Sequence, residues 1–289
     1  MVLGPPGLRV LSSDATRLAV WGDPIAHSRS PQLHAAAYRV LDLEWSYERR
    51  RVDMATFPEV LASLDHGWRG LSLTMPLKAA AFAAARTRDG RARLTGAVNT
   101  LLLTADGPHG FNTDVPGIVD ALGDEGVTSV GTARIVGAGA TATSALVALA
   151  ELGSHHVQIV ARRPEAIAEL VAMGEEVGVT VAAAAWDEPR LDDVAVTIAT
   201  LPGGAQVTDA AADALAAHGG FLLDAVYGHW PTALGAAWDR TGRPAASGLG
   251  MLLRQALVQV RIFVAGDPDV PLGDEDAVLA AMRDAAMGD

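Results

Sequence analysis

The sequence contains no cysteine among its 289 residues, which excludes disulfide bonds, thiolate metal sites and cysteine nucleophiles. Basic residues are also scarce, because 22 Lys and Arg stand against 34 Asp and Glu, for a formal net charge of −12 at pH 7. A nucleic-acid-binding surface normally needs a basic stripe, so this charge argues against such a partner. No apolar run approaches the roughly 20 residues that span a bilayer, and the N-terminus lacks a secretory pattern. We therefore expect a cytoplasmic monomer or homodimer that acts on small molecules.

The first part of the chain alternates strand and helix patterns. Its length and its 50% hydrophobic content predict a globular protein of one large or two medium domains. The predicted strands are 18–22, 45–52, 70–75, 96–104 and 109–112, and the predicted helices are 31–41, 55–65 and one beginning at Lys78. This alternation favours an open α/β sheet.

Residues 70–78, with the sequence GLSLTMPLK, predict a strand that has one apolar and one polar face. Pro76 cannot continue a strand ladder and restricts the residue before it, so the strand should end there. Lys78 then begins an alanine-rich helix, which places one ammonium group beside a polar strand face. Such a lysine can hold a small molecule, or it can be a solvated surface residue.

The second part of the chain predicts a doubly wound parallel sheet, because its strands are apolar on both faces and are separated by helices. The predicted strands are 134–136, 157–163, 180–186, 194–204 and 221–228, and the helices are 141–150, 208–217, 248–266 and 275–287. Another predicted helix begins at Asp114.

A glycine-rich turn follows the first of these parallel strands and fits the pattern G-x-G-x-x-A. Its residues are Gly137, Ala138, Gly139, Ala140, Thr141 and Ala142. Glycines there allow backbone N–H groups to approach a pyrophosphate closely, and the helix N-terminus favours the same anion. With a strand before it and a helix and strand after it, the turn predicts dinucleotide binding rather than a purely structural turn.

The end of the next strand indicates which dinucleotide binds. An NAD enzyme normally places an acid there, whereas this chain has Ala161, Arg162 and Arg163. Two guanidinium groups suit a 2′-phosphate by charge and by their planar arrangement of donors, although two solvated arginines would look the same in sequence. We therefore predict NADP(H) rather than NAD(H), and we predict no metal site.

Uncharged polar residues gather at the predicted strand ends and turns of the first part. They are Ser28, Ser30, Ser72, Thr74, Asn99 and Thr113. Together with Lys78 and Asp114, they suit a small polyhydroxylated substrate that carries a carboxylate. Each also has a structural interpretation, since Ser30 and Asp114 are good helix N-caps and Asn99 is a typical turn residue.

Six blocks in this order resemble the successive motifs of the shikimate dehydrogenase family. They are GDPIAHSRSPQLH, GLSLTMPLK, GAVNTL, NTDVPG, VGAGATA and SGLGMLLRQA, and the resemblance runs from Leu18 to about Gly266. It implies two open α/β domains: a substrate-binding domain of residues 1–114 and 248–289, and a Rossmann-type NADP-binding domain of residues 115–247. It also implies reversible NADPH-dependent reduction of 3-dehydroshikimate to shikimate, in the pathway to chorismate and aromatic amino acids.

The resemblance implies roles for particular residues. Lys78 and Asp114 match the catalytic pair. The substrate-binding positions would be Ser28 and Ser30 for the carboxylate, Thr74 and Asn99 for the ring hydroxyls, and Ser72, Tyr227 and Gln255 in the same pocket. Gly248 joins the glycine turn and the two arginines in the predicted cofactor-binding set. Several positions depart from the family pattern: Ser72 stands where asparagine is usual, Ala140 replaces a common third glycine of the turn, and Arg163 has no counterpart.

Three alternatives remain open at this point. A dehydrogenase of the same fold could prefer quinate or an amino-substituted ring, and Ser72 is the residue that leaves this choice open. A folate-linked dehydrogenase would share the two-domain plan without needing the two serines and Gln255. A non-catalytic ligand-sensing protein could keep the fold, although retention of both Lys78 and Asp114 argues against it.

Overall fold

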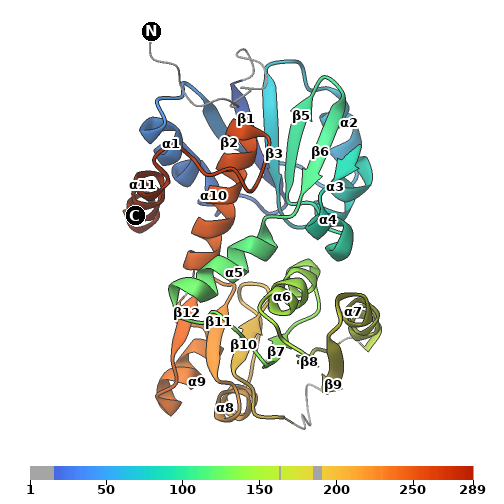
Figure 1. Ribbon diagram of the computed structural model, residues 1–289, viewed down its shortest axis with the longest axis vertical. Helices are drawn as coiled ribbons and strands as arrows, with labels where there is room; N and C mark the ends of the chain where they lie inside the picture. The colour runs from blue at the N-terminus through green and yellow to red at the C-terminus, as the bar shows by residue number, and fades with distance from the viewer. Residues whose placement is uncertain (1–15, 163, 185–190, 229, 289) are drawn as a thin grey trace. The chain divides into compact units, whose positions relative to one another are not determined.

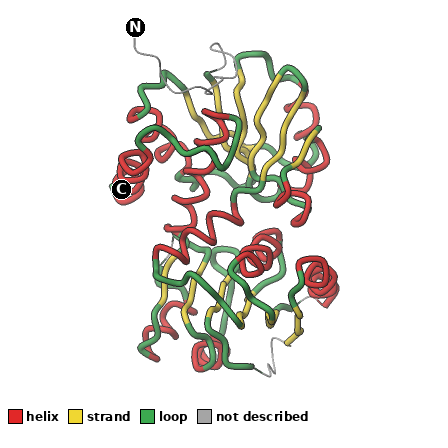
Figure 2. The backbone as a smooth tube through the Cα atoms, in the orientation of Figure 1, coloured by secondary structure: helices red, strands yellow, loops and turns green. Residues whose placement is uncertain are grey.

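The computed structural model describes residues 16–162, 164–184, 191–228 and 230–288. By its internal contacts the chain divides into two units. Unit 1 comprises the residues through Thr113 and those from Ala256 onward, and unit 2 comprises Asp114–Gln255. Each unit contains a six-stranded sheet, which confirms the predicted α/β class (Figures 1 and 2). Within the described ranges, no helix is long and apolar enough to cross a membrane.

Unit 1 is built on a mixed sheet with the strand order β2-β1-β3-β5-β6-β4. Its strands are β1 (Arg17–Gly22), β2 (Ser46–Arg51), β3 (Trp68–Leu73), β4 (Thr87–Arg88), β5 (Thr100–Thr104) and β6 (Gly107–Phe111). Its helices are α1 (Ser30–Val40), α2 (Phe57–Ala62), α3 (Lys78–Ala84), α4 (Gly90–Thr95), α11 (Glu275–Met287) and the part of α10 (Leu249–Ala265) from Ala256 onward. The first three strands in chain order are parallel, and β5 runs antiparallel to both β3 and β6.

Strand β3 separates two layers because its side chains alternate between the faces of the sheet. Leu71 and Leu73 pack into an apolar core with residues of α2 and α3. On the other face, α10 approaches so closely that a Cβ at Gly70 would lie 2.4 Å from the Phe263 ring. Arg69 fixes the same contact, because its guanidinium donates to the backbone carbonyls of Phe263 and Val264.

Unit 2 contains an all-parallel sheet with the strand order β12-β11-β10-β7-β8-β9, as predicted for a doubly wound fold. Its strands are β7 (Thr132–Val136), β8 (His156–Val160), β9 (Thr180–Ala184), β10 (Val196–Ala199), β11 (Phe221–Asp224) and β12 (Ala245–Ser247). Its helices are α5 (Asp114–Asp124), α6 (Ala140–Glu151), α7 (Pro164–Val177), α8 (Asp209–Ala217), α9 (Ala233–Thr241) and the start of α10. Helices α6 and α7 cover one face, and α8 and α9 cover the other (Figure 1).

Helix α7 and four short elements, β4, α4, α9 and β12, were not predicted. The predicted strand 96–104 begins only at Thr100, because α4 ends at Thr95 and its C-cap, Gly96, has a left-handed φ of 63° rather than an extended one. Helix α4 is started by Asp89, whose carboxylate accepts the Ala92 N–H, and α9 is started in the same way by Thr232. Side-chain caps of this kind stabilise helices that are too short to show a clear apolar period. The end of the predicted strand 180–186 lies outside the described residues.

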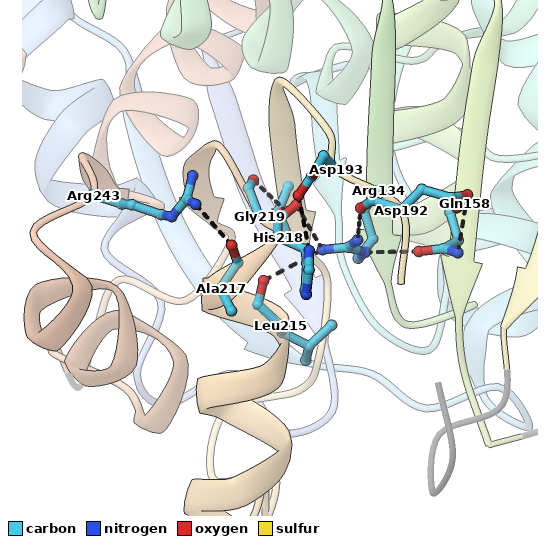
Figure 3. Close-up of polar contacts among 10 residues, drawn as sticks. Arg134, Gln158, Asp192, Asp193, Leu215, Ala217, His218, Gly219 and Arg243 are labelled. Atoms are coloured by element: carbon cyan, nitrogen blue, oxygen red, sulfur yellow. Dashed lines mark hydrogen bonds and ion pairs between the residues drawn. The ribbon is translucent and has the colours of Figure 1, made fainter. Parts of the chain in front are cut away.

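A buried arginine ties together the loop before β10 and the end of α8 (Figure 3). Arg134 on β7 is fully buried, and its guanidinium donates to Gln158 Oε1 at 3.0 Å and to the Asp192 carbonyl at 2.5 Å. It also reaches the carbonyls of Leu215 and His218, at 3.3 and 3.4 Å. Burial lowers the pKa of Arg134 to about 10, so the side chain remains charged at neutral pH.

We expect Arg134→Ala to destabilise the protein by about 2–4 kcal/mol. The backbone carbonyls that accept hydrogen bonds from its guanidinium would lose a charged donor. Urea unfolding followed by circular dichroism measures the effect. Arg243→Ala is the matched control, since the Arg243 guanidinium donates to a single carbonyl, that of Ala217, at an exposed site. The control should cost less than about 1 kcal/mol, and equal losses in the two variants would contradict the role of Arg134.

Candidate functional site

Two serines lie where the loop after β1 enters helix α1. The Ser28 hydroxyl donates to Ser30 Oγ at 3.3 Å, and the Ser30 backbone N–H donates back to Ser28 Oγ at 3.3 Å. Helix α1 begins at Ser30, and the N-cap position belongs to Arg29, so the Ser30 hydroxyl does not cap the helix. The two hydroxyls therefore form a pair that can turn toward a carboxylate.

The end of β3 brings Ser72 and Thr74 to the same side of unit 1. Ser72 is buried, and its hydroxyl bonds the phenol of Tyr47 on β2 at 2.6 Å and the side-chain oxygen of Gln259 on α10 at 2.7 Å. The Thr74 N–H donates to the Trp21 carbonyl at 3.0 Å, which ties the chain after β3 to β1. A Cβ at Gly22 would lie 2.5 Å from the Thr74 methyl, so only glycine fits beside this threonine.

Lys78 and Asn99 are linked through the backbone at this end of the sheet. Lys78 is the first residue of α3, and its carbonyl accepts the Val98 N–H at 3.0 Å. The buried Asn99 side chain accepts the Thr113 N–H at 2.9 Å and donates to the Thr113 hydroxyl at 2.9 Å. Asn99 therefore fixes the chain that leads out of β6, in addition to any contact with a ligand.

The structure adds His34, Tyr47 and Gln259 to the residues that the sequence singled out. His34 is fully buried, and its ring stacks on Tyr47 with centroids 3.9 Å apart. Burial lowers the pKa of His34 to about 3 and raises that of Tyr47, so both side chains are neutral at physiological pH. Helical spacing could have identified two of them, because His34 follows Ser30, and Gln259 follows Gln255, by four residues.

In unit 2, Asp114 is the first residue of α5, and Gln255 lies near the start of α10. These helices cross closely, since a Cβ at Gly117 would lie 2.7 Å from the Gln255 Cβ. The Gln255 amide nitrogen donates to the Leu252 carbonyl at 3.0 Å. The close crossing holds Gln255 firmly against α5.

Tyr227 lies in the loop after β11, which Asp224 stabilises. The Asp224 carboxylate accepts the Val226 N–H at 3.1 Å and the Thr232 hydroxyl at 2.6 Å. The Gly248 N–H donates to the Val226 carbonyl at 3.0 Å, and a Cβ at Gly248 would lie 2.3 Å from the Ala225 carbonyl oxygen. Gly248 is therefore required by the backbone contact with this loop, whether or not it also touches a cofactor.

The glycine turn has the conformation that a phosphate-binding turn needs. Gly137 has a φ of 116°, and a Cβ there would lie 2.5 Å from the Thr200 hydroxyl, so both backbone and space require glycine. Gly139 occupies the N-cap position of α6, where no side chain caps the helix. Ala138 and Thr141 are half-buried, Ala140 is exposed and Ala142 is buried. Uncapped N–H groups at a helix N-terminus suit an anion, so the residues present fit a dinucleotide pyrophosphate.

Arg162 is exposed and lies two residues beyond the end of β8. Its position matches the strand end where dinucleotide-binding folds meet the adenosine ribose. Arg163 lies outside the described residues.

A family model for the shikimate dehydrogenase substrate-binding domain matches residues 20–101. The shikimate dehydrogenase (NADP(+)) of Methylobacterium radiotolerans is 39% identical over 93% of this chain and 99% of its own. That of Thermus thermophilus is 35% identical over 92% of this chain and 98% of its own.

Solved structures agree with these relatives. The crystal structure of Mycobacterium tuberculosis shikimate dehydrogenase has a TM-score of 0.83 and 41% identity, and covers 93% of this chain and 99% of its own. A Thermus thermophilus shikimate 5-dehydrogenase in complex with NADP(H) and shikimate has a TM-score of 0.76 and 29% identity, with 93% and 99% coverage. Similarity at this level over nearly the whole length, in sequence and in structure, shows that the chain belongs to the shikimate dehydrogenase family.

Proposed function

We propose that this protein is an NADP-dependent shikimate dehydrogenase that reversibly reduces 3-dehydroshikimate to shikimate. The observation that carries the proposal is the 39% identity to a curated shikimate dehydrogenase (NADP(+)) over 93% of this chain. In this proposal unit 1 binds the substrate, and unit 2 binds NADP(H) at the glycine turn. The glycine conformations and the uncapped start of α6 support the second assignment.

We assign the substrate carboxylate to the paired hydroxyls of Ser28 and Ser30, which are close enough to donate to one anion. The ring hydroxyls would meet Ser72, Thr74 and Asn99, which lie at strand ends of the same sheet. Tyr227 and Gln255, in unit 2, are the remaining residues that we assign to substrate binding.

The bound nicotinamide would supply the hydride, and the protein would supply placement and a proton. Lys78 donates that proton to the ketone oxygen as negative charge develops on it, and it takes the proton back in the oxidation direction. Asp114, the first residue of α5, is the second proposed catalytic residue. Arg162 would bind the 2′-phosphate through charge-assisted hydrogen bonds.

The direct test of the substrate is a steady-state assay of shikimate and quinate, each with NADP⁺ and with NAD⁺, followed by the absorbance of the reduced cofactor. We expect shikimate with NADP⁺ to have the highest kcat/KM. A higher kcat/KM for quinate would replace the proposed substrate, and the absence of turnover with either ring would contradict a catalytic function.

We expect Lys78→Ala to lower kcat by about 10²–10⁴-fold, because the ketone oxygen loses its proton donor. NADPH affinity, measured by fluorescence titration, should stay nearly unchanged. Lys78→Arg is the matched control for charge: arginine keeps the cation but does not give up its proton, so this variant should remain slow. Unimpaired turnover in Lys78→Ala would remove this lysine from the chemistry.

We expect Arg162→Ala to raise the KM for NADPH by about 10–100-fold, because the 2′-phosphate loses a charged donor worth about 1.5–3 kcal/mol. The KM for NADH should change little, since NADH carries no phosphate there. Arg240→Ala, at another exposed arginine of unit 2, should change neither value. Equal weakening of NADPH and NADH by Arg162→Ala would refute the 2′-phosphate assignment.

A further inference from the structure

Ser72 is the centre of a buried polar chain that connects β2, β3, α1 and α10 within unit 1. Its hydroxyl has one hydrogen to donate, and two neighbouring oxygens could each receive it. Tyr47 Oη lies 2.6 Å away on one side, and Gln259 Oε1 lies 2.7 Å away on the other. The orientation of the Gln259 amide therefore decides what Ser72 offers to a ligand.

Two neighbours fix the Gln259 amide. Its nitrogen faces the Asn99 carbonyl at 3.5 Å, and its oxygen faces His34 Nε2 at 3.2 Å. A carbonyl oxygen can only accept, so the amide nitrogen must point toward Asn99 and the amide oxygen toward His34 and Ser72.

His34 fits this orientation in only one tautomer. The ring is neutral, because burial lowers the pKa of His34 to about 3, and a neutral imidazole carries a single N–H. Its Nδ1 lies 3.0 Å from the Tyr38 hydroxyl, which can donate to it. The hydrogen therefore belongs on Nε2, where it points to the Gln259 oxygen.

The Ser72 hydrogen is consequently directed inward. Gln259 Oε1 accepts from both His34 Nε2 and Ser72 Oγ, while Tyr47 donates its phenolic hydrogen to Ser72 Oγ. Toward a ligand, Ser72 then presents an acceptor lone pair.

We propose that Gln259 is a positioning residue for the substrate: by accepting the Ser72 hydrogen it makes Ser72 an acceptor, which selects a ring substituent that donates a hydrogen bond. This inference rests on the proposed function, because it takes Ser72 as a substrate contact. A hydroxyl or ammonium group satisfies the Ser72 lone pair, whereas a carbonyl or ether oxygen meets it with a second acceptor.

The same geometry gives a physical account of serine at this position. In this chain the hydroxyl comes from Ser72 and the amide beside it comes from Gln259. An asparagine at position 72 would supply an amide from the same residue instead. Asparagine at position 72 would extend into the space of the Gln259 side chain, since Ser72 Oγ is already 2.7 Å from it. The identities of the two residues should therefore be coupled.

The first test is Gln259→Leu, which keeps the volume of the side chain and removes its acceptor. We expect the KM for shikimate to rise about tenfold, equivalent to the loss of one hydrogen bond, while kcat changes less than about threefold and the KM for NADP⁺ is unchanged. Val258→Ala is the control for packing, because Val258 is buried on the same helix. That variant should lower the Tm and leave the KM for shikimate unchanged.

The second test is a rescue. Ser72→Asn alone should raise the KM for shikimate, because it crowds Gln259, and the double variant Ser72→Asn with Gln259→Ala should restore it to within about threefold of the wild type. An unchanged KM in Gln259→Leu, or a double variant at least as impaired as both single variants combined, would overturn the positioning role. Absence of shikimate turnover in the wild type would instead contradict the proposed function.

Discussion

The contact between β3 and the later part of α10 is the constraint on which unit 1 depends. It joins segments from opposite parts of the sequence, and it is held by the absence of a side chain at Gly70 and by the Arg69 bonds to the α10 backbone. Because this contact fixes the depth and rotation of α10, it also fixes where Gln259 lies. The polar chain through Ser72 is therefore a consequence of helix packing. Because the position of Gln259 is fixed, each hydrogen bond of this uncharged network has a defined donor and acceptor.

In unit 2, the proposed cofactor site depends on the backbone conformation of the glycine turn, whereas the proposed substrate site in unit 1 depends on hydrogen bonds between side chains. Gly137 is confined by Thr200, and Gly248 is confined by the Ala225 carbonyl. Neither position tolerates a Cβ, so the turn and the Tyr227 loop are held by close backbone approach. Arg134 supports the sheet from within, where it links β7 to the loop before β10.

Much of this organisation could be predicted from the sequence, because it follows local patterns. The alternation in 70–75 identified β3 and its polar face, and the glycine turn identified the start of α6. The short helices α4 and α9 were missed, since their signal is a capping side chain rather than an apolar period. His34 and Gln259 were missed for another reason: each lies four residues from a residue that the sequence singled out, but the bond that gives them a role joins positions 225 residues apart.

The orientation of the hydrogen bonds around His34 is the central claim, and ¹⁵N NMR of histidine-labelled protein tests it most directly. The chain has eight histidines, so His34→Gln identifies the relevant signals. We predict a neutral ring with hydrogen on Nε2 and none on Nδ1, unchanged between pH 8 and pH 5, because burial lowers the pKa of His34 to about 3. A ring that titrates near the ordinary value of about 6.5, or one that carries its hydrogen on Nδ1, would contradict the account.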